Sequence, residues 1–287
     1  MVKKIAGFFT GGFTESGALQ YFLEKFDDSI KVKQFCPNKA MKRRGTNGKP
    51  HMVKEVNGLT GPSLIHYVYD YIDKYLDDLQ TYDAILIEDD MDDRFYECMV
   101  PGDESTKRKC NNKEFVDYCH EIRKTIREKM HKDENYPVFL VFASPEIETW
   151  FLADWQNSFG RVYGPKGEKI LSNEANNYFS HSFRNYINQK VLKEYKDSLE
   201  AYGYFDGIYV KLSSKIQEAL SGEYKVMISQ EDRYGISECQ ELVYSKQLHG
   251  DKMLRNISPL AVGKKCSMFF KKEYCEIKEF AATEDLC

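Results

Sequence analysis

The chain has 287 residues, of which 42% are hydrophobic and 30% are charged, and its formal net charge at pH 7 is −4. This composition excludes a disordered chain, and the negative charge excludes a general electrostatic attraction to nucleic acid, so any such binding must be local. The sequence has no run of about 18 apolar residues, which predicts a cytoplasmic protein with no membrane partner.

The first half of the sequence alternates between predicted strands and helices. Apolar runs predict strands over 3–10, 30–35, 82–87 and 137–143, and helical spacing predicts helices over 16–26, 63–79 and 114–132. The segment 41–61 is basic, contains glycine and lacks periodicity, so it is predicted to be a surface loop. This alternation indicates an α/β fold, with a mostly parallel sheet flanked by helices in a Rossmannoid core.

The pattern becomes helical in the second half of the chain. Segments 183–201, 212–220 and 237–248 have helical spacing. We therefore predict a core over 1–160 and a mainly helical C-terminal extension over 161–287 that packs on this core.

Acidic residues gather where the third predicted strand ends. Positions 88–93 hold five carboxylates, at Glu88, Asp89, Asp90, Asp92 and Asp93. In extended backbone Glu88, Asp90 and Asp92 point to one side, and ligand sites in open parallel sheets form at the carboxyl edge. Because close like charges repel, and because carboxylate oxygens suit Mg²⁺ or Mn²⁺, the run predicts a divalent-metal site. The plainer alternative is an acidic, solvated loop.

Three further glutamates follow predicted strands at the same edge. Glu15 begins the helix after the first strand, where its carboxylate could complete the metal site. Glu146 and Glu148 follow the fourth strand. Glu146 is interpreted as an acid that complements the dipole of the next helix, and Glu148 is predicted to bind metal or to orient a ligand. The aromatic residues after them, Trp150 and Phe151, are predicted to be core.

Basic residues supply candidate contacts to nucleic acid. They form two stretches, Lys42, Arg43 and Arg44, and Lys107, Arg108 and Lys109. Basic loops also occur for solubility alone. Lys246 and His249 are three residues apart and could share a helix face, where the lysine would contact the scissile phosphate and the histidine would bind phosphate or move a proton. Their alternative interpretation is as surface residues of a helix.

The eight cysteines form no CxxC pair, as expected of reduced thiols. Cys110, Cys119 and His120 are an alternative set of zinc ligands, but their spacing fits no standard zinc motif. Ordinary buried thiols are the preferred interpretation.

Four short motifs resemble a known family. The sequence Gly-Phe-Thr-Glu at 12–15 resembles the G-x-T-E of Toprim-like proteins related to the OLD-family nucleases and to RloB-type proteins, and Asp90-Met91-Asp92 matches their DxD. Residues 144–154 resemble the P-x-x-E-x-W-x-L-A-D signature of a Toprim-like family of unknown function, and residues 244–250 resemble its K-x-x-H-G. The motifs occur in order over most of the chain.

The resemblance implies a Toprim-like core that binds divalent metal and cuts or rejoins nucleic acid. It also implies an ABC- or OLD-type ATPase partner in an antiphage or restriction-associated system. One residue departs from the pattern, because the usual glutamate at the end of the first strand falls on Gly11. Either one metal position is lost, or Glu146 or Glu148 compensates, or the site is degenerate and binds without cutting.

The leading hypothesis is therefore a metal-dependent nuclease, or nuclease-like subunit, for DNA or RNA. Its catalytic residues are Glu15, Asp90, Asp92, Glu148 and Lys246, and its ligands for Mg²⁺ or Mn²⁺ are Glu15, Glu88, Asp90, Asp92 and Glu148. A second hypothesis is a catalytically degenerate binding or sensor subunit of an ATPase complex. A third is small-molecule phosphotransfer or hydrolysis, although the nucleophilic aspartate of HAD-type phosphatases belongs where this chain has Gly-Gly-Phe-Thr. Self-association is left open.

Overall fold

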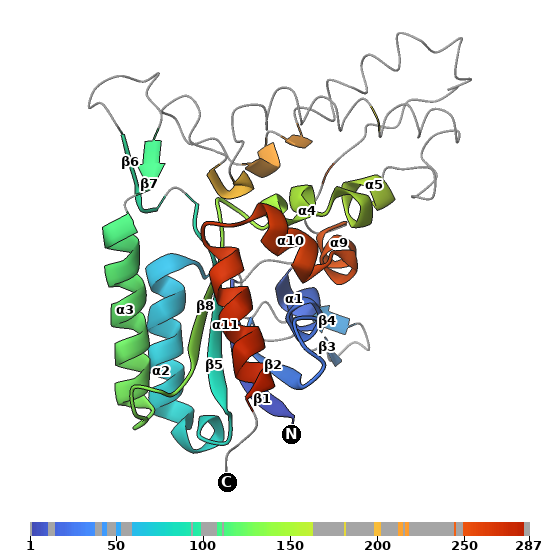
Figure 1. Ribbon diagram of the computed structural model, residues 1–287. Helices are drawn as coiled ribbons and strands as arrows, with labels where there is room; N and C mark the ends of the chain where they lie inside the picture. Colours follow the sequence, from blue (N-terminus) through green and yellow to red (C-terminus); the bar gives the residue numbers. More distant parts are fainter. Residues whose placement is uncertain are drawn as a thin grey trace, which may run out of the picture.

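Figure 1 shows the computed structural model of the chain. The structure describes residues 2–10, 15–37, 42–44, 50–52, 59–92, 94–98, 108–110, 112–162, 181, 198–201, 212–214, 216–217, 244 and 249–283. For residues 15, 16, 42–44, 50–52, 96–98, 108–110 and 201 it describes the backbone alone. Within these ranges, no helix combines the length and the hydrophobicity that a bilayer-spanning segment requires.

A sheet of four parallel strands in the order β2-β1-β5-β8 forms the centre of the molecule. Its strands are β1 (Lys3–Phe9), β2 (Ile30–Cys36), β5 (Ala84–Asp90) and β8 (Val138–Ala143). Every residue of β5 and β8 is buried, as expected of parallel strands that are covered on both faces. The predicted α/β class is confirmed, and the carboxyl ends of all four strands lie at one edge of the sheet.

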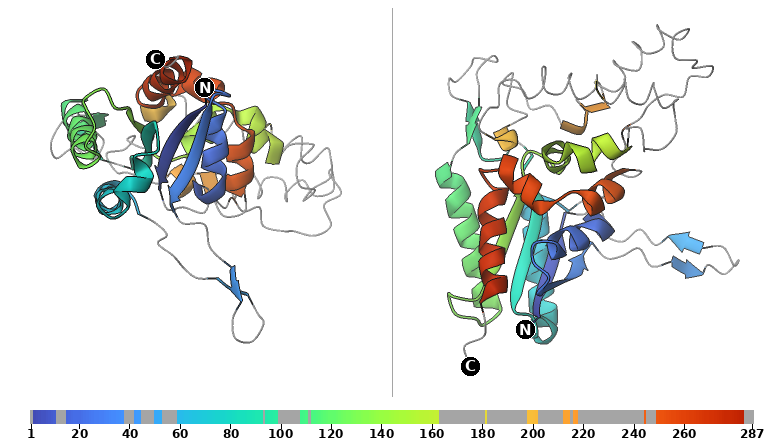
Figure 2. Two further views of the ribbon diagram at one scale, coloured as in Figure 1. Left: turned by 90° about the horizontal axis from the view of Figure 1, so that it is seen from below. Right: turned by 45° about the vertical axis from the view of Figure 1, so that its right-hand side comes forward.

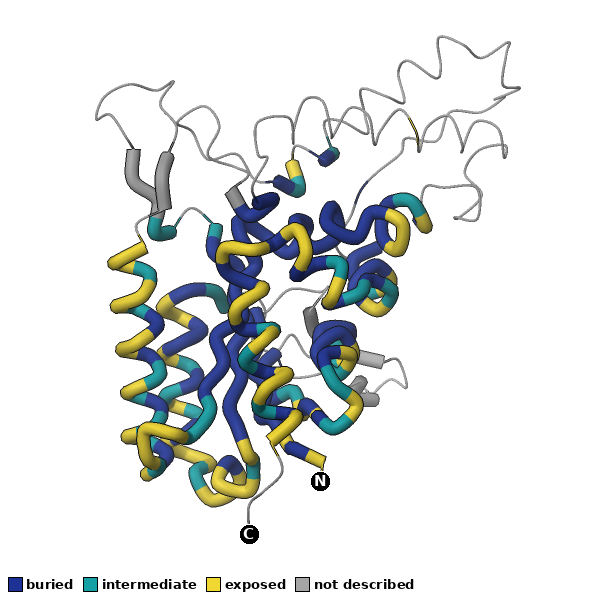
Figure 3. The backbone as a smooth tube through the Cα atoms, viewed as in Figure 1, coloured by how far each residue is buried: buried dark blue, intermediate teal, exposed yellow. Residues whose placement is uncertain are grey.

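Helices cover both faces of this sheet (Figures 1 and 2). On one face, α2 (Gly61–Leu79) and α3 (Asn112–Lys129) pack against apolar side chains that include Ile85 and Ile87. The opposite face, which includes Leu86, is covered by α1 (Glu15–Glu24), α4 (Glu148–Ala153), α9 (Asp251–Asn256), α10 (Pro259–Lys265) and α11 (Phe270–Ala282). Figure 3 shows the buried residues concentrated between these layers.

The C-terminal helices complete the second layer. Helix α11 contacts β8, and its Phe270 ring lies 5.1 Å from the ring of Trp150, which in turn stacks on Phe22 at 5.3 Å between centroids. Trp150 and Phe151 are fully buried, so their predicted place in the core is confirmed. Shorter turns after α4 are η1 (Trp155–Asn157), α5 (Phe159–Val162) and η3 (Leu199–Ala201). The division into 1–160 and 161–287 stays a prediction.

The edge strand β8 is closed by side chains from the two flanking helices. The Leu140 N–H donates to Glu273 Oε2 of α11 at 3.0 Å, and Arg123 Nε of α3 donates to the Val138 carbonyl at 3.1 Å. Arg123 and Glu273 also form an ion pair of 2.5 Å. Two backbone groups of β8, the Val138 carbonyl and the Leu140 N–H, are thereby satisfied within the chain.

Both basic stretches contain short strands that sequence reasoning did not predict. Strand β3 (Lys42–Arg44) pairs antiparallel with β4 (Pro50–Met52), and β6 (Tyr96–Cys98) pairs antiparallel with β7 (Arg108–Cys110). The prediction of a loop over 41–61 is wrong for the strand residues, because three-residue strands are too short to show a period. Residues 212–214 and 216–217 are helical as predicted, whereas the predicted helices over 183–201 and 237–248 fall largely outside the described residues.

Candidate functional site

The acidic end of β5 is divided between the two faces of the sheet. Asp89 lies on the α2–α3 face, where both of its oxygens accept the Gly61 N–H at 3.0 Å and Oδ2 pairs with Arg94 Nη2 at 2.5 Å. Gly61 begins α2 with φ +56°, and an added Cβ would lie 3.2 Å from Arg94 Nη1. A glycine is therefore required at the point where α2 meets this carboxylate.

Arg94 fixes the turn that follows β5. Besides Asp89, its guanidinium donates to the Asp90 carbonyl at 2.6 Å, to the Met91 carbonyl at 3.2 Å and to the Tyr118 hydroxyl at 3.4 Å. Burial raises the pKa of Asp89 above its usual value, while Arg94 and the Gly61 N–H oppose that rise. Burial by itself lowers the pKa of Arg94, but the neighbouring Asp89 carboxylate raises it, and the pKa is raised overall. Asp89 is thus engaged by protein groups and supports the fold.

Glu88 and Asp90 lie on the opposite face, because side chains alternate along a strand. Glu88 Oε2 accepts the Thr10 N–H at 3.2 Å, from the segment that follows β1. Asp90 Oδ1 accepts the Ile147 N–H at 3.1 Å, from the segment that precedes α4. Both carboxylates are buried, so two acidic groups of one strand lie between the ends of β1 and β8 at the carboxyl edge of the sheet.

Asp92 lies beyond the strand and does not continue its alternation. Strand β5 ends at Asp90, and Asp92 has φ 50°, a left-handed conformation that aspartate tolerates better than most residues. Its N–H donates to the Pro145 carbonyl at 2.8 Å. The extended arrangement expected for Glu88, Asp90 and Asp92 therefore applies to the first two residues only.

The two glutamates after β8 contact C-terminal segments. Glu146 precedes α4, and its two oxygens accept hydrogen bonds from Leu212 N at 3.1 Å and Ser213 Oγ at 3.0 Å. The interpretation of Glu146 as an acid of the first helical turn is wrong, because it binds another segment instead. Glu148 is the first residue of α4, and its Oε1 accepts the Tyr244 hydroxyl at 2.9 Å.

This contact joins two of the motifs that sequence analysis singled out. Tyr244 belongs to the stretch 244–250, and Glu148 belongs to the stretch 144–154. His249 is buried beside them, with its ring centroid 6.4 Å from that of Tyr244. His249 therefore lies in the interior next to α4, and a direct contact with a nucleic-acid backbone would require it to become exposed.

Several predicted site residues fall outside the described part of the structure. Helix α1 begins at Glu15, but the Glu15 side chain is not among the described parts of the structure. Lys107 and Lys246 lie entirely outside the described residues. The backbones of Lys42, Arg43 and Arg44 form β3, and those of Arg108 and Lys109 belong to β7, without described side chains. Among the side chains that the structure does describe, no three acidic, histidine or cysteine groups gather closely enough to hold a metal ion.

The donor set fits a hard divalent cation in its chemistry but is incomplete. Glu88 and Asp90 supply carboxylate oxygens on one face, and Mg²⁺ and Mn²⁺ prefer such ligands. A third carboxylate has to come from Glu15, whose helix follows β1, or from the turn that holds Asp92. The alternative zinc set is not favoured, because burial raises the pKa of the Cys119 thiol to about 12 while the neighbouring His120 is exposed.

Sequence reasoning missed Arg94 and Glu200. An arginine directly after an acidic run is a signal of an internal ion pair, and Arg94 stands five residues after Asp89. Glu200 gave no such signal. Its carboxylate is buried and accepts the N–H groups of Met268, Phe269 and Phe270 at 2.6, 3.0 and 2.9 Å, where α11 begins.

Comparison of the chain with protein-family models, with characterised proteins and with solved structures finds no match. The resemblance carried by the four short motifs therefore stays a prediction. Any assignment of function depends on the residues at the carboxyl edge of the sheet.

Proposed function

We propose that the chain is a divalent-metal-dependent nuclease, or a nuclease-like subunit, that acts on phosphodiester bonds of DNA or RNA. The observation that carries the proposal is the position of Glu88 and Asp90, which are buried on one face of β5 at the carboxyl edge of the sheet. Two ionised carboxylates about 7 Å apart along a strand repel each other when they are buried, and a shared cation removes that repulsion.

In this proposal the chain holds the metal with residues from three segments. Glu15, Glu88, Asp90 and Asp92 provide oxygen ligands, and the hydrogen bond from Tyr244 positions Glu148 at the start of α4. A bound Mg²⁺ or Mn²⁺ would lower the pKa of an attacking water and offset charge at the phosphorus. Lys246 would contact the scissile phosphate. The nucleic-acid backbone would lie along the basic residues 42–44 and 107–109.

The wider setting in the proposal comes from the motif resemblance. It comprises an ABC- or OLD-type ATPase partner and a role in antiphage defence or restriction, whereas the proposed cytoplasmic location comes from the lack of a long apolar run. The ordered motifs Gly12–Glu15, Asp90–Asp92, 144–154 and 244–250 are its support.

The test compares Asp90→Asn combined with Asp92→Asn against Asp83→Asn. Asp83 precedes β5 at the opposite end of the sheet, where its Oδ2 accepts the Lys4 N–H at 2.6 Å, much as Asp90 accepts that of Ile147. We expect the double substitution to lower Mn²⁺-dependent cleavage by about 100-fold or more, and Asp83→Asn to keep the parent rate. Label release from single- and double-stranded DNA and RNA gives the rates, and thermal melting verifies folding.

A second candidate function is a binding or sensor subunit that works through a partner ATPase. It is favoured by the contacts of Glu146, whose oxygens accept hydrogen bonds from Leu212 and Ser213, so this residue does not replace the glutamate that is missing at Gly11. No cleavage by the parent with Mg²⁺ or Mn²⁺, together with co-purification with an ATPase, would support this function. Equal cleavage by the parent and the double variant would contradict the proposed metal site.

A further inference from the structure

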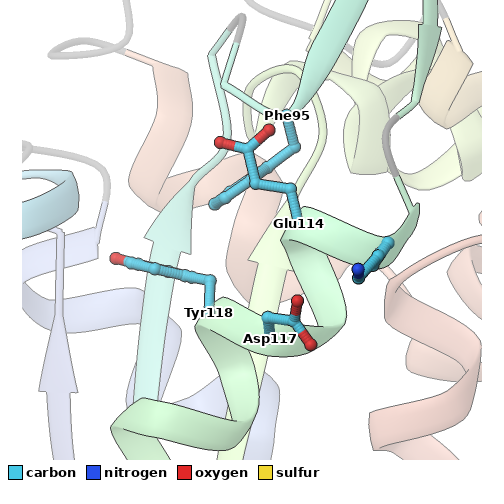
Figure 4. Close-up of a pocket in the computed structure, with 5 residues that line it drawn as sticks. Phe95, Glu114, Asp117 and Tyr118 are labelled. Atoms are coloured by element: carbon cyan, nitrogen blue, oxygen red, sulfur yellow. The ribbon is translucent and has the colours of Figure 1, made fainter.

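An open hollow lies on the surface beside the turn that follows β5, on the α2–α3 side of the sheet. Its volume is about 490 Å³, and it is lined by Phe95 from the turn after β5 and by Lys113, Glu114, Asp117 and Tyr118 from α3. Figure 4 shows Glu114 one helical turn before Asp117 and Tyr118 on α3, with Phe95 beside Glu114. The lining therefore combines two aromatic rings with two carboxylates and one ammonium group.

The aromatic part of the hollow is held in place by packing. The Phe95 ring lies 5.0 Å from the Tyr118 ring and 5.5 Å from the Phe115 ring, measured between centroids. Phe95 nevertheless remains half-exposed, and its φ is 65°. A bulky residue rarely adopts this left-handed conformation, and such backbone strain concentrates at binding and catalytic sites.

Arg94 connects the hollow to the acidic end of β5. It donates to the carbonyl of Asp90 and to the hydroxyl of Tyr118, and its guanidinium carbon lies 5.7 Å from the Phe95 ring centroid. One side chain thus joins the main chain at Asp90 to the aromatic wall. The hollow is thereby tied to the end of the strand that carries Asp90.

The polar groups of the hollow are suited to a base more than to a phosphate. Glu114 and Asp117 are exposed carboxylates, which repel phosphate and accept hydrogen bonds from N–H groups. Guanine carries adjacent N1–H and N2–H₂ donors that one carboxylate can accept together, and its O6 accepts from an ammonium group such as that of Lys113. Unpaired bases are recognised in this way, by stacking on aromatic rings and by hydrogen bonds to the Watson–Crick edge.

We propose that this hollow binds an unpaired guanine of the substrate strand, stacked on Phe95 and Tyr118 and read by Glu114, Asp117 and Lys113. This inference rests on the proposed nuclease function and narrows its substrate to single-stranded or locally opened nucleic acid that contains guanine. A base inside a duplex cannot enter, because its Watson–Crick edge is paired.

The experiment measures binding of the full chain to labelled thymine oligonucleotides with one central guanine, inosine or thymine, by fluorescence anisotropy in Ca²⁺. Inosine lacks only the N2 amino group. We expect guanine to bind about 10-fold more tightly than inosine or thymine, because an unmade hydrogen bond leaves a carboxylate without its partner. Glu114→Gln combined with Asp117→Asn should remove that preference while thymine binding is retained.

Two further variants separate stacking from charge. Phe95→Leu should weaken binding of all three oligonucleotides by about 10-fold, since base stacking on an aromatic ring is lost, and should abolish the fluorescence quenching of 2-aminopurine placed at the central position. Glu121→Gln is the matched control, because Glu121 is an exposed acid of α3 outside the hollow. It should bind as the parent does.

The outcomes distinguish this inference from the function on which it rests. Cleavage and binding by the parent without a guanine preference, unchanged in the hollow variants, would overturn the guanine site and leave the nuclease proposal standing. Equal or tighter binding of the inosine or thymine oligonucleotide would overturn the assignment of the base. No binding of any oligonucleotide and no cleavage by the folded parent would overturn both.

Discussion

The two faces of the sheet use the acidic end of β5 in different ways. On the α2–α3 face, Asp89 is held by the Arg94 guanidinium and by the first N–H of α2. On the other face, Glu88 and Asp90 accept backbone N–H groups from segments next to β1 and α4. Neighbouring carboxylates can thus have unrelated roles, since alternation along a strand sends one to support the fold and the next to the edge where ligands bind.

The largest expected effect on stability is at Asp89. Asp89→Ala removes the partner of Arg94 and of the Gly61 N–H, and we expect the free energy of unfolding to fall by about 3 kcal/mol. Urea denaturation measures this loss. Combining Asp89→Ala with Arg94→Ala should cost less than the sum of the single substitutions, because the two side chains form one interaction. A loss below about 1 kcal/mol for Asp89→Ala, in the range of ordinary substitutions, would remove the contrast between the faces.

Glu200 is a second buried carboxylate, and its substitution tests whether an acidic side chain also stabilises the fold on the sheet face that α1 and α11 cover. Glu200→Gln places an amide NH₂ among the N–H groups of Met268, Phe269 and Phe270, so we expect a loss of about 1–3 kcal/mol. Glu121→Gln, an exposed change of the same chemistry, should change stability little. An unchanged midpoint of denaturation for Glu200→Gln would mean that α11 begins without help from this carboxylate.

The pH dependence of that loss has a defined sign. Burial raises the pKa of Glu200 above 4.5, against the opposing effect of the three N–H groups. A raised pKa in the folded state means that the folded chain binds the proton more tightly, so the contribution is full below pH 4.5 and is lost as the pH rises through the folded-state value. The difference in unfolding free energy between the parent and Glu200→Gln should therefore shrink as the pH rises from 4.5 through the folded-state pKa of Glu200.

The main elements of the fold could be predicted from the sequence, but the contacts that organise the site could not. The apolar run at 84–87 and the periodicity of 63–79 report local burial, which a sequence displays directly. The same rule of alternation places Glu88 and Asp90 on one face. It could not show that β5 ends before Asp92, because the turn is fixed by Arg94, Pro145 and Gly61, which no local pattern relates.

Hydrogen bonds between segments that are far apart in the sequence are harder still to predict from it. Glu148 and Tyr244 are 96 residues apart, and Glu200 reaches backbone groups 68 to 70 residues away. Such hydrogen bonds depend on the packed position of two elements and impose no period on either one. The role of Glu146 was misread for this reason, since its position close to the start of a helix was visible while its partners at Leu212 and Ser213 were not.

The smallest expected effect on stability is at Asp73, whose ion pair is nearly as short as that of Asp89 but is exposed. Comparing the two pairs tests whether burial or the N–O distance determines how much an ion pair stabilises the fold. Lys129 Nζ contacts Asp73 Oδ2 at 2.6 Å on the outside of the α2–α3 layer, nearly as short as the pair of Arg94 with Asp89. The Asp73 and Lys129 side chains are 57% and 29% exposed, whereas Asp89 is 2% exposed, so water screens the outer pair. Asp73→Asn should therefore lower the unfolding free energy by about 0.5 kcal/mol or less, and high salt should remove even that difference. A loss as large as that of Asp89→Ala, measured in the same urea titration, would show that burial does not determine which of these ion pairs stabilises the fold.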